Sequence, residues 1–219
     1  MLIDIHIHEN KYSHDSHVSL PRVIQQAKNI GLDGICITDH NSNQIKKEAK
    51  QLAAASDFLI IVGAEVLTEE GDILVFGLEK LPPAKLSAQQ LIDLVNAQGG
   101  VAIAAHPFRD NGRGLRNKIK KLQGLHGIEV LNGRTVVEAN LQAYHLSQEL
   151  NLAALGASDA HRASRIGKYV SYFETEIKNR QDFITAIKNQ QVSPAIYHNN
   201  SFKKVEPPKN YHQQQLAQL

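Results

Sequence analysis

The sequence has little sulfur, no tryptophan and no long apolar run. Among its 219 residues are one cysteine and one methionine, and aromatic residues make up 5%. The single cysteine, Cys36, excludes an internal disulfide, and its place in the apolar run GICIT favours a packed thiol. No apolar run approaches the roughly 20 residues that cross a bilayer. No basic region precedes an apolar segment at the N-terminus, so we expect no signal peptide, no membrane contact and a cytoplasmic location.

An excess of charge of one sign is also absent. Lysine and arginine total 24 against 22 acidic residues, which gives a net charge of +2. The total therefore indicates neither a nucleic-acid-binding surface nor an acidic partner. The one concentrated basic segment is RDNGRGLRNKIKK at 109–121. It is either a mobile loop that grips an anionic substrate or a solvated helix face, and the helical spacing of its lysines favours the second interpretation.

Apolar strand-like segments alternate with helical ones along residues 1–200. Examples are the strand 58–64, which runs into Glu65, the strand 72–78, which would pair with it as a hairpin, and the loop and helix over 109–122. This alternation is typical of a parallel sheet covered by helices. About seven such units favour a distorted (β/α)7 TIM-like barrel in a single α/β domain. A doubly wound sheet is the alternative, although no G-x-G-x-x-G follows a strand. Residues 201–219 form a polar tail, read as a surface appendage or a short terminal helix.

The first strand, LIDIHIH over 2–8, alternates apolar and polar residues. Its isoleucines would face the core, while His6 and His8 would point the same way, either into water or at a metal ion. Most later strands also end in a side chain that can bind a metal. These are Asp39, His40, Glu65, His106, Asn132, Asp159 and His161. Because the carboxyl ends of barrel strands converge on one face, the sequence predicts a polynuclear site there. Imidazole and carboxylate without thiolate suit zinc, manganese or iron.

Seven short motifs in order give the sequence a family resemblance. They are HIH at 6–8, SHDS at 13–16, ITDHN at 37–41, GAEV at 63–66, AHP at 105–107, EVLNG at 129–133 and SDAH at 158–161. The ordered set resembles the PHP domain (polymerase and histidinol phosphatase) over residues 1 to about 175. The resemblance implies a distorted seven-stranded barrel, two to three divalent metal ions (Mn, Zn or Fe) at its C-terminal face, and phosphoester hydrolysis.

Carried over position by position, the resemblance implies three metal positions. The first would be held by His6, His8, Glu65 and Asp159. Glu65 would also bridge to a second ion, which takes His106. The third would be held by Asp15, His40 and His161. The same match places His40, Asp159 and His161 in the catalytic set.

Three of these positions depart from the family pattern or stay open. Many members have a histidine near Asp72, which is either a substitute ligand or a turn residue. Some have a histidine at Asn132, and an amide is a poorer ligand. In the loop, His14 and Asp15 compete, and the match favours Asp15. Asp4 and Asp39 would either orient imidazoles or cap strand ends.

The implied chemistry is attack on phosphorus by a metal-bound hydroxide, with the ions neutralising the phosphoryl oxygens. Metal-bound water or a histidine of the third position would protonate the leaving group. Arg109, Arg134 and Arg162 lie in loops on the presumed active face and are candidates to bind phosphate. Each would otherwise be a solvated surface charge.

We therefore expect a phosphatase acting on a small phosphomonoester, such as a nucleotide, a nucleoside bisphosphate or a sugar or amino-alcohol phosphate. No obligate protein partner is evident. One alternative is an exonuclease-like phosphodiesterase on short oligonucleotides. Another is a non-catalytic module that binds metal, which the nearly complete ligand set disfavours. An amidohydrolase-type C–N hydrolase is a third, but such enzymes often bridge metals with a lysine at a strand end, and here the bridge is Glu65.

Overall fold

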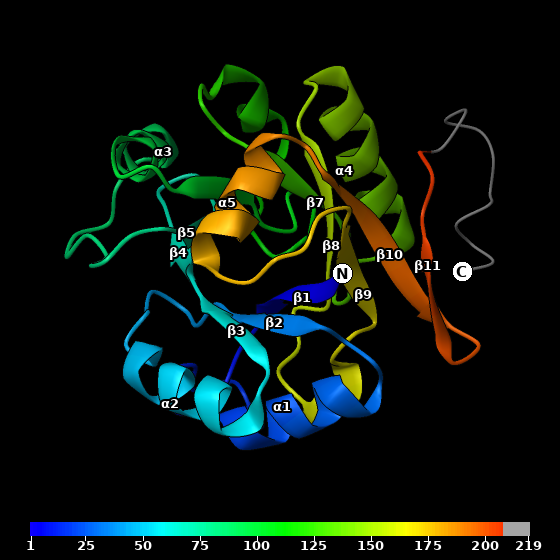
Figure 1. The fold of residues 1–219 in the computed structure, drawn as a ribbon. Coiled ribbons are helices and arrows are strands. Elements are labelled where there is room, and N and C mark those ends of the chain that lie inside the picture. Colours follow the sequence, from blue (N-terminus) through cyan, green and yellow to red (C-terminus); the bar gives the residue numbers. More distant parts are fainter. Residues whose placement is uncertain (208–219) are drawn as a thin grey trace.

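The computed structural model describes residues 1–207 of the chain as one mixed α/β domain whose strands form two sheets (Figure 1). The strands of the first sheet are β1 Leu2–Ile7, β2 Gly34–Ile37, β3 Leu59–Val62, β9 Tyr169–Phe173, β10 Val192–His198 and β11 Ser201–Lys204. Those of the second are β4 Ala64–Leu67, β5 Asp72–Phe76, β6 Val101–Ala104, β7 Gly127–Asn132 and β8 Ala153–Ala157. The orders are β11-β10-β9-β1-β2-β3 and β4-β5-β6-β7-β8.

Helices pack against both sheets. They are α1 Leu20–Asn29, α2 Lys46–Ser56, α3 Ala88–Ala97, α4 Val137–Glu149 and α5 Arg180–Lys188, with 3-10 turns η1 Arg116–Lys121 and η2 Ala163–Arg165. In Figure 1, α1 and α2 lie below β1, β2 and β3. Apolar residues at helical spacing explain why α1 folds there, because Val23, Ile24 and Ala27 are buried against this sheet. None of the described helices is both long enough and apolar enough to cross a membrane.

The predicted barrel is supported only in part. Strands β1, β2 and β3 pair in parallel, as do β6, β7 and β8, but β4-β5-β6 and β9-β10-β11 are antiparallel. Over residues 1–207 the ladders do not form one closed sheet. Two isolated parallel bridges join the sheets, Ile7 with Ala160 and His40 with Glu65. The first bridge brings the end of β1 beside the segment that follows β8, and the second brings the segment that follows β2 beside β4.

The predicted strand 58–64 is in fact divided at Gly63. Strand β3 ends at Val62, and β4 begins at Ala64 and belongs to the other sheet, so Glu65 lies inside a strand rather than after one. A side chain at Gly63 would place its Cβ 2.6 Å from the Phe76 ring and 2.7 Å from the Val75 carbonyl oxygen. The chain passes from sheet to sheet here because glycine permits this close approach. The predicted hairpin is present, as β4 with β5.

Two other predictions need correction. The helix expected within 109–122 is only the 3-10 turn η1, because Arg116 adopts a left-handed φ of 52° and only Ile119 in this turn is buried. The tail expected from residue 201 begins instead with β11, which pairs with β10, and Val205 after it is buried. Neither a surface appendage nor a helix describes residues 201–205, and residues 208–219 lie outside the described part.

Strand β1 is buried on both faces. Ile3, Ile5 and Ile7 are fully inaccessible and belong to the apolar core, as expected. Asp4, His6 and His8 on the other face are also 0% exposed, so a water-facing polar strand face is excluded. Burying imidazoles away from water requires partners for their nitrogens.

Candidate metal centre

His6 and His8 come together at the end of β1. Because alternate residues of a strand point to the same face, their Nε2 atoms lie 2.8 Å apart. The Nδ1 atom of His6 lies 2.7 Å from Oε1 of Glu129, a fully buried carboxylate on β7. Burial works to raise the pKa of Glu129, but His6 outweighs it and the pKa is lowered, so the carboxylate accepts and His6 Nδ1 donates. In its neutral form, His6 would then carry its lone pair on Nε2, which is directed at His8.

Two carboxylates complete this first group. Asp159 Oδ1 lies 3.4 Å from His8 Nε2 and 3.7 Å from His6 Nε2. Glu65 oxygens lie 3.6 Å from His8 Nε2 and 3.7 Å from His6 Nε2. Four ligands about 2.0–2.2 Å from a tetrahedral ion are separated from one another by roughly such distances. Imidazole lone pairs and carboxylates facing one point therefore fit a divalent cation.

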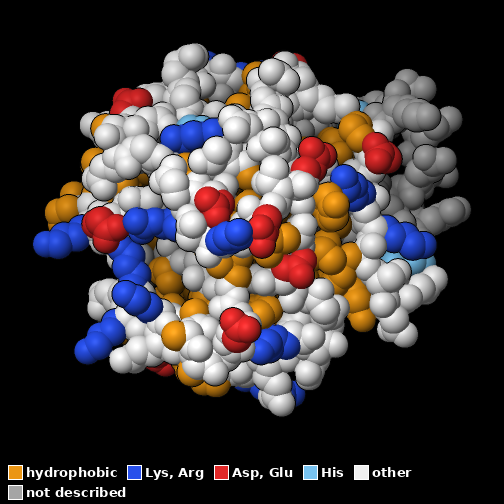
Figure 2. Space-filling view, in the orientation of Figure 1, with side chains coloured by type: hydrophobic (Ala, Val, Ile, Leu, Met, Phe, Trp, Pro, Cys, Tyr) orange, Lys and Arg blue, Asp and Glu red, His pale blue; other side chains and the backbone are white. Residues whose placement is uncertain are grey.

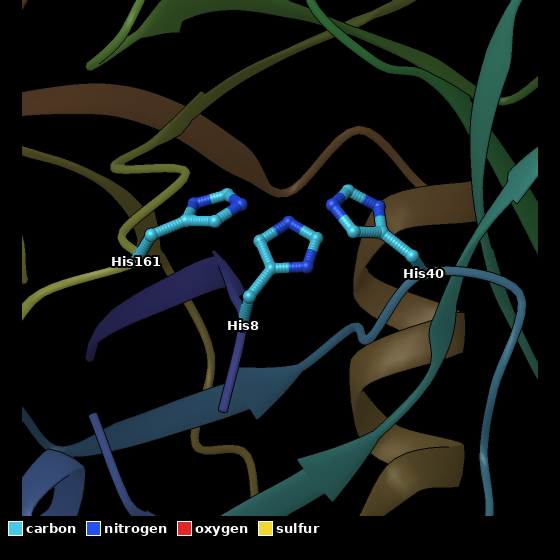
Figure 3. A group of neighbouring side chains, drawn as sticks. All are labelled: His8, His40 and His161. Atoms are coloured by element: carbon cyan, nitrogen blue, oxygen red, sulfur yellow. The ribbon is translucent and has the colours of Figure 1, made fainter. Parts of the chain in front are cut away.

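A second group surrounds His8 on its other side. Figure 3 shows the rings of His8, His40 and His161 pointing toward one another from the ends of β1, β2 and β8. Asp15 lies among them, with Oδ1 3.3 Å from His40 Nε2 and Oδ2 3.0 Å from His161 Nε2. His14, the rival candidate, and Asp15 are both exposed, but it is Asp15 that contacts these histidines. This second group therefore contains Asp15, His40 and His161, the three residues that the resemblance implies as ligands of a third ion.

Glu65 stands between the first and second groups. Its Oε2 atom lies 2.6 Å from Nδ1 of His40, yet both atoms are buried without a well-directed hydrogen bond among the described residues. Burial works to raise the pKa of Glu65, but the charge of His6 and the bond from His106 hold it well below its usual value. An ionised carboxylate with an unpaired buried oxygen is suited to a bridging ligand.

The third group consists of Glu65, Asp72 and His106. These are the residues that the sequence analysis connects with the second ion. His106 Nε2 lies 2.7 Å from Glu65 Oε1 and 3.8 Å from Asp72 Oδ2. Asp72 is fully buried, and both of its oxygens accept hydrogen bonds from Arg113, at 2.6 Å from Nε and 3.0 Å from Nη2. Asp72 is therefore close to its predicted place but already paired.

Asp4 and Asp39 behave differently from each other. Asp4 accepts from the backbone N–H groups of Ser158 and Gly167, at 3.0 and 2.9 Å, and so fastens loops rather than an imidazole. Burial raises its pKa to about 6. Asp39 accepts from the Ser13 hydroxyl at 2.8 Å, and that hydroxyl lies 3.2 Å from His8 Nδ1. Asp39 thus orients an imidazole through an intervening serine.

The predicted phosphate-binding arginines surround the centre. Arg109 donates to Asn132 Oδ1 at 2.5 Å and contacts Asp159. Arg134 Nη1 lies 2.9 Å from His161 Nδ1. Arg134 and Arg162 also line an open cavity of about 670 Å³. Its wall includes Asp15, His161 and Arg165. An anion in this cavity would lie beside the second group.

Three residues of the site lack a role in the sequence prediction: Glu129, Ser13 and Arg113. Glu129 lies within a quoted motif and is the one charge in the buried strand 127–132, which is a usable signal because buried carboxylates need partners. Ser13 also lies in a quoted motif. Arg113 carries no such signal, because basic residues are common in loops.

Comparison with known proteins gives two kinds of likeness. Residues 137–192 match the PHP-associated family model. An uncharacterized protein of Methanocaldococcus jannaschii, MJ1587, is 33% identical over 165 residues, which cover 71% of this chain and 90% of that protein.

Solved structures share the fold. A two-domain protein from Bacteroides vulgatus, said to contain a "predicted PHP-like metal-dependent phosphoesterase", has a TM-score of 0.74 at 21% identity, covering 89% of this chain and 64% of that one. The lesion-specific endonuclease PfuEndoQ from Pyrococcus furiosus has a TM-score of 0.65 at 19% identity, covering 86% of this chain and 56% of that one. At these identities the likeness concerns the fold. Taken with the family-model match and the extent of the relationship to MJ1587, it shows that the chain belongs to the PHP domain family.

Proposed function

We propose that this protein is a metal-dependent phosphoesterase that hydrolyses a small phosphomonoester. The observation that carries the proposal is the shared carboxylate. Glu65 lies between the His6–His8–Asp159 group and the Asp15–His40–His161 group, and an arginine-lined cavity opens beside them. The phosphoesterase named in the Bacteroides structure supports the same class.

The proposal assigns the residues of the site to two roles, metal binding and phosphate binding. His6, His8, Glu65 and Asp159 would hold one ion, and Asp15, His40 and His161 another, of manganese, zinc or iron. Ions held there would lower the pKa of water and neutralise phosphoryl charge. Arg134 and Arg162 bind the remaining phosphoryl oxygens, since guanidinium groups pair well with phosphate. His161 borders both the donor group and the cavity, so an ion that it holds would lie beside a phosphoryl group in the cavity.

We further infer that strands β1, β2 and β4–β8 surround this centre as a distorted barrel. The bridges of Ile7 with Ala160 and of His40 with Glu65 support this interpretation, because they connect the two edges of the second sheet, at β8 and β4, to the ends of β1 and β2 in the first.

The direct test is a panel of nucleotides, nucleoside bisphosphates and sugar phosphates, assayed for phosphate release with added manganese, zinc or iron. We expect the wild type to release phosphate and Asp159→Asn to release none. Circular dichroism should show that the variant is still folded. Asp110→Asn is the matched control, because Asp110 is an exposed carboxylate on the loop after His106. A metal-loaded wild type that hydrolyses no member of the panel contradicts the proposal.

A phosphodiesterase acting on short oligonucleotides is the second candidate, and the shared fold with an endonuclease favours it. The net charge of +2 does not. On the face shown in Figure 2, acidic side chains lie among the basic ones. A length series from mononucleotide to hexanucleotide separates the two. We expect turnover to be highest for the mononucleotide, and an increase with length would favour the phosphodiesterase.

A further inference from the structure

We propose that Arg113 acts as a built-in cation at the third donor group, so that the loaded centre holds two divalent ions rather than three. Asp72 would then be the partner of a guanidinium and not a metal ligand. The inference rests on the metal centre of the proposed function and concerns its composition.

The side-chain geometry is that of a paired carboxylate. Arg113 donates to both oxygens of Asp72, from Nε at 2.6 Å and from Nη2 at 3.0 Å. The Asp72 side chain is 0% exposed, whereas that of Arg113 is 35% exposed, so the guanidinium enters from the surface. A two-pronged guanidinium–carboxylate contact is the strongest common form of this pair.

The backbone holds Arg113 in this place. The N–H of Asp72 donates to the Arg113 carbonyl oxygen at 2.8 Å. A Cβ on Gly71 would lie 2.7 Å from that same oxygen, and a Cβ on Gly114 would lie 2.2 Å from the Pro107 carbonyl oxygen. The loop that follows His106 is thus packed against the start of β5 at Gly71, and it is folded closely back on Pro107 at Gly114. The position of Arg113 is therefore set by main-chain contacts as well as by its side chain.

Too few donors remain for an ion at this position. With Asp72 occupied, His106 Nε2 faces Glu65 Oε1 at 2.7 Å, and that oxygen also lies 3.7 Å from His6 Nε2 in the first group. The amide oxygen of nearby Asn132 accepts from the Arg109 side chain and the Arg134 backbone. Zinc sites in enzymes usually have three protein ligands, whereas only His106 and the shared Glu65 remain here.

Charge acts in the same direction. A guanidinium stays protonated at all relevant pH values, and Arg113 takes both oxygens of Asp72, whereas Arg109 contacts only Oδ2 of Asp159 and leaves Oδ1 facing His6 and His8. Arg113 also neutralises Asp72, which would otherwise lie unpaired beside Glu65. The positive charge at the third group is therefore supplied by the Arg113 side chain instead of by a metal ion.

Metal stoichiometry tests the proposal without reference to catalysis. The full-length protein is stripped with a chelator, refilled with manganese, desalted and analysed by mass spectrometry for ions per chain. We expect two ions in the wild type and three in Arg113→Gln, which frees Asp72. Arg116→Gln is the matched control, because Arg116 is an exposed arginine of the same loop that pairs with Asp110. It should hold two ions.

Asp72→Asn keeps the test decisive if Arg113→Gln does not fold. We expect Asp72→Asn to retain both ions, and the double variant Arg113→Gln/Asp72→Asn to lose the added one. Three ions in the wild type, no added ion in folded Arg113→Gln, or one ion lost in Asp72→Asn would each overturn the proposal. An absence of bound metal in every protein would instead overturn the metal centre on which the proposed function depends.

Discussion

Glu129 orients His6 in the first donor group. Its Oε1 accepts from His6 Nδ1, while Oε2 accepts from the His106 backbone N–H at 2.8 Å and from Asn132 Nδ2 at 2.9 Å. An ionised carboxylate can accept on both oxygens, whereas an amide cannot. Glu129 therefore positions His6 and the turn at His106 together.

Glu129→Gln should weaken metal binding at the first position by about 10- to 100-fold, the usual range for a partner that orients a ligand. The amide nitrogen would face the donors that Oε2 now accepts from. Isothermal titration with manganese measures the effect, and Glu138→Gln is the control, since Glu138 is exposed at the start of α4. Equal affinities in the two variants would exclude this role.

His126 should make stability depend on pH. Burial and the nearby charge of Lys188 lower its pKa below 6.5, and its Nδ1 accepts from the Ala102 N–H at 3.2 Å. Because the folded-state pKa is depressed, the stabilising contribution is complete above pH 6.5 and is lost as the pH falls below it. His126→Asn keeps an acceptor that does not titrate.

Urea unfolding between pH 5.5 and 7.5 checks this expectation. The stability of wild type relative to His126→Asn should fall toward the acidic end, while the metal-site histidines titrate equally in both proteins. Parallel stability curves would show that His126 is not responsible.

The sequence predicts residues of the centre better than their partners. His6, His8, Asp15, His40, Glu65, His106, Asp159 and His161 lie in local motifs, and the structure brings them into the predicted groups. Glu129 pairs with His6 across 123 positions and Arg113 with Asp72 across 41. No local pattern encodes such pairs, because they depend on which strands and loops become neighbours.

At the scale of elements, the local sequence pattern at the start of α3 agrees with the structure. Ser87 accepts from the Gln90 N–H at 3.3 Å, and Gln90 Oε1 accepts from the Ser87 N–H at 3.0 Å. This reciprocal pair can be read from the sequence, since serine followed three residues later by glutamine marks a helix start.

Ser87→Ala should lower the free energy of unfolding by about 1 kcal/mol, while Ser87→Gly should cost only a few tenths. Chemical denaturation at pH 7 measures both, with the metal content held constant. An alanine variant as stable as the wild type would mean that the cap contributes nothing.

The division at Gly63 shows where local patterns fail. The apolar run 58–64 reads as one strand, and only the packing of Phe76 and Val75 against Gly63 divides it. The edge strand β11 was missed for a similar reason. Its residues are polar and mostly exposed, and pairing with β10 is what makes them a strand.

At the scale of the whole molecule, the two sheets meet at the donor groups. Fully buried His6, His8, Glu65 and Asp159 come from β1, β4 and the end of β8, which belong to different sheets. Cations bound there would connect the sheets and neutralise the buried carboxylates. Metal binding should therefore stabilise the entire domain.

Manganese should raise the thermal midpoint of chelator-treated protein, with about 4 kcal/mol of added stability at a free concentration 1,000 times the dissociation constant. Magnesium should add less, because imidazole-rich sites suit it poorly. Differential scanning calorimetry compares the two ions. A thermal midpoint that manganese leaves unchanged would show that metal binding at the donor groups does not stabilise the domain.

The most direct test of a metal-dependent phosphoesterase is a titration that follows occupancy and turnover together. Chelator-stripped protein receives increasing manganese, and bound metal and phosphate release from the best substrate of the panel are measured on the same samples. We predict no release from the stripped protein and a rise that reaches its plateau when the sites are full. Release that does not depend on bound metal, or full occupancy without hydrolysis of any phosphoester, would contradict the account.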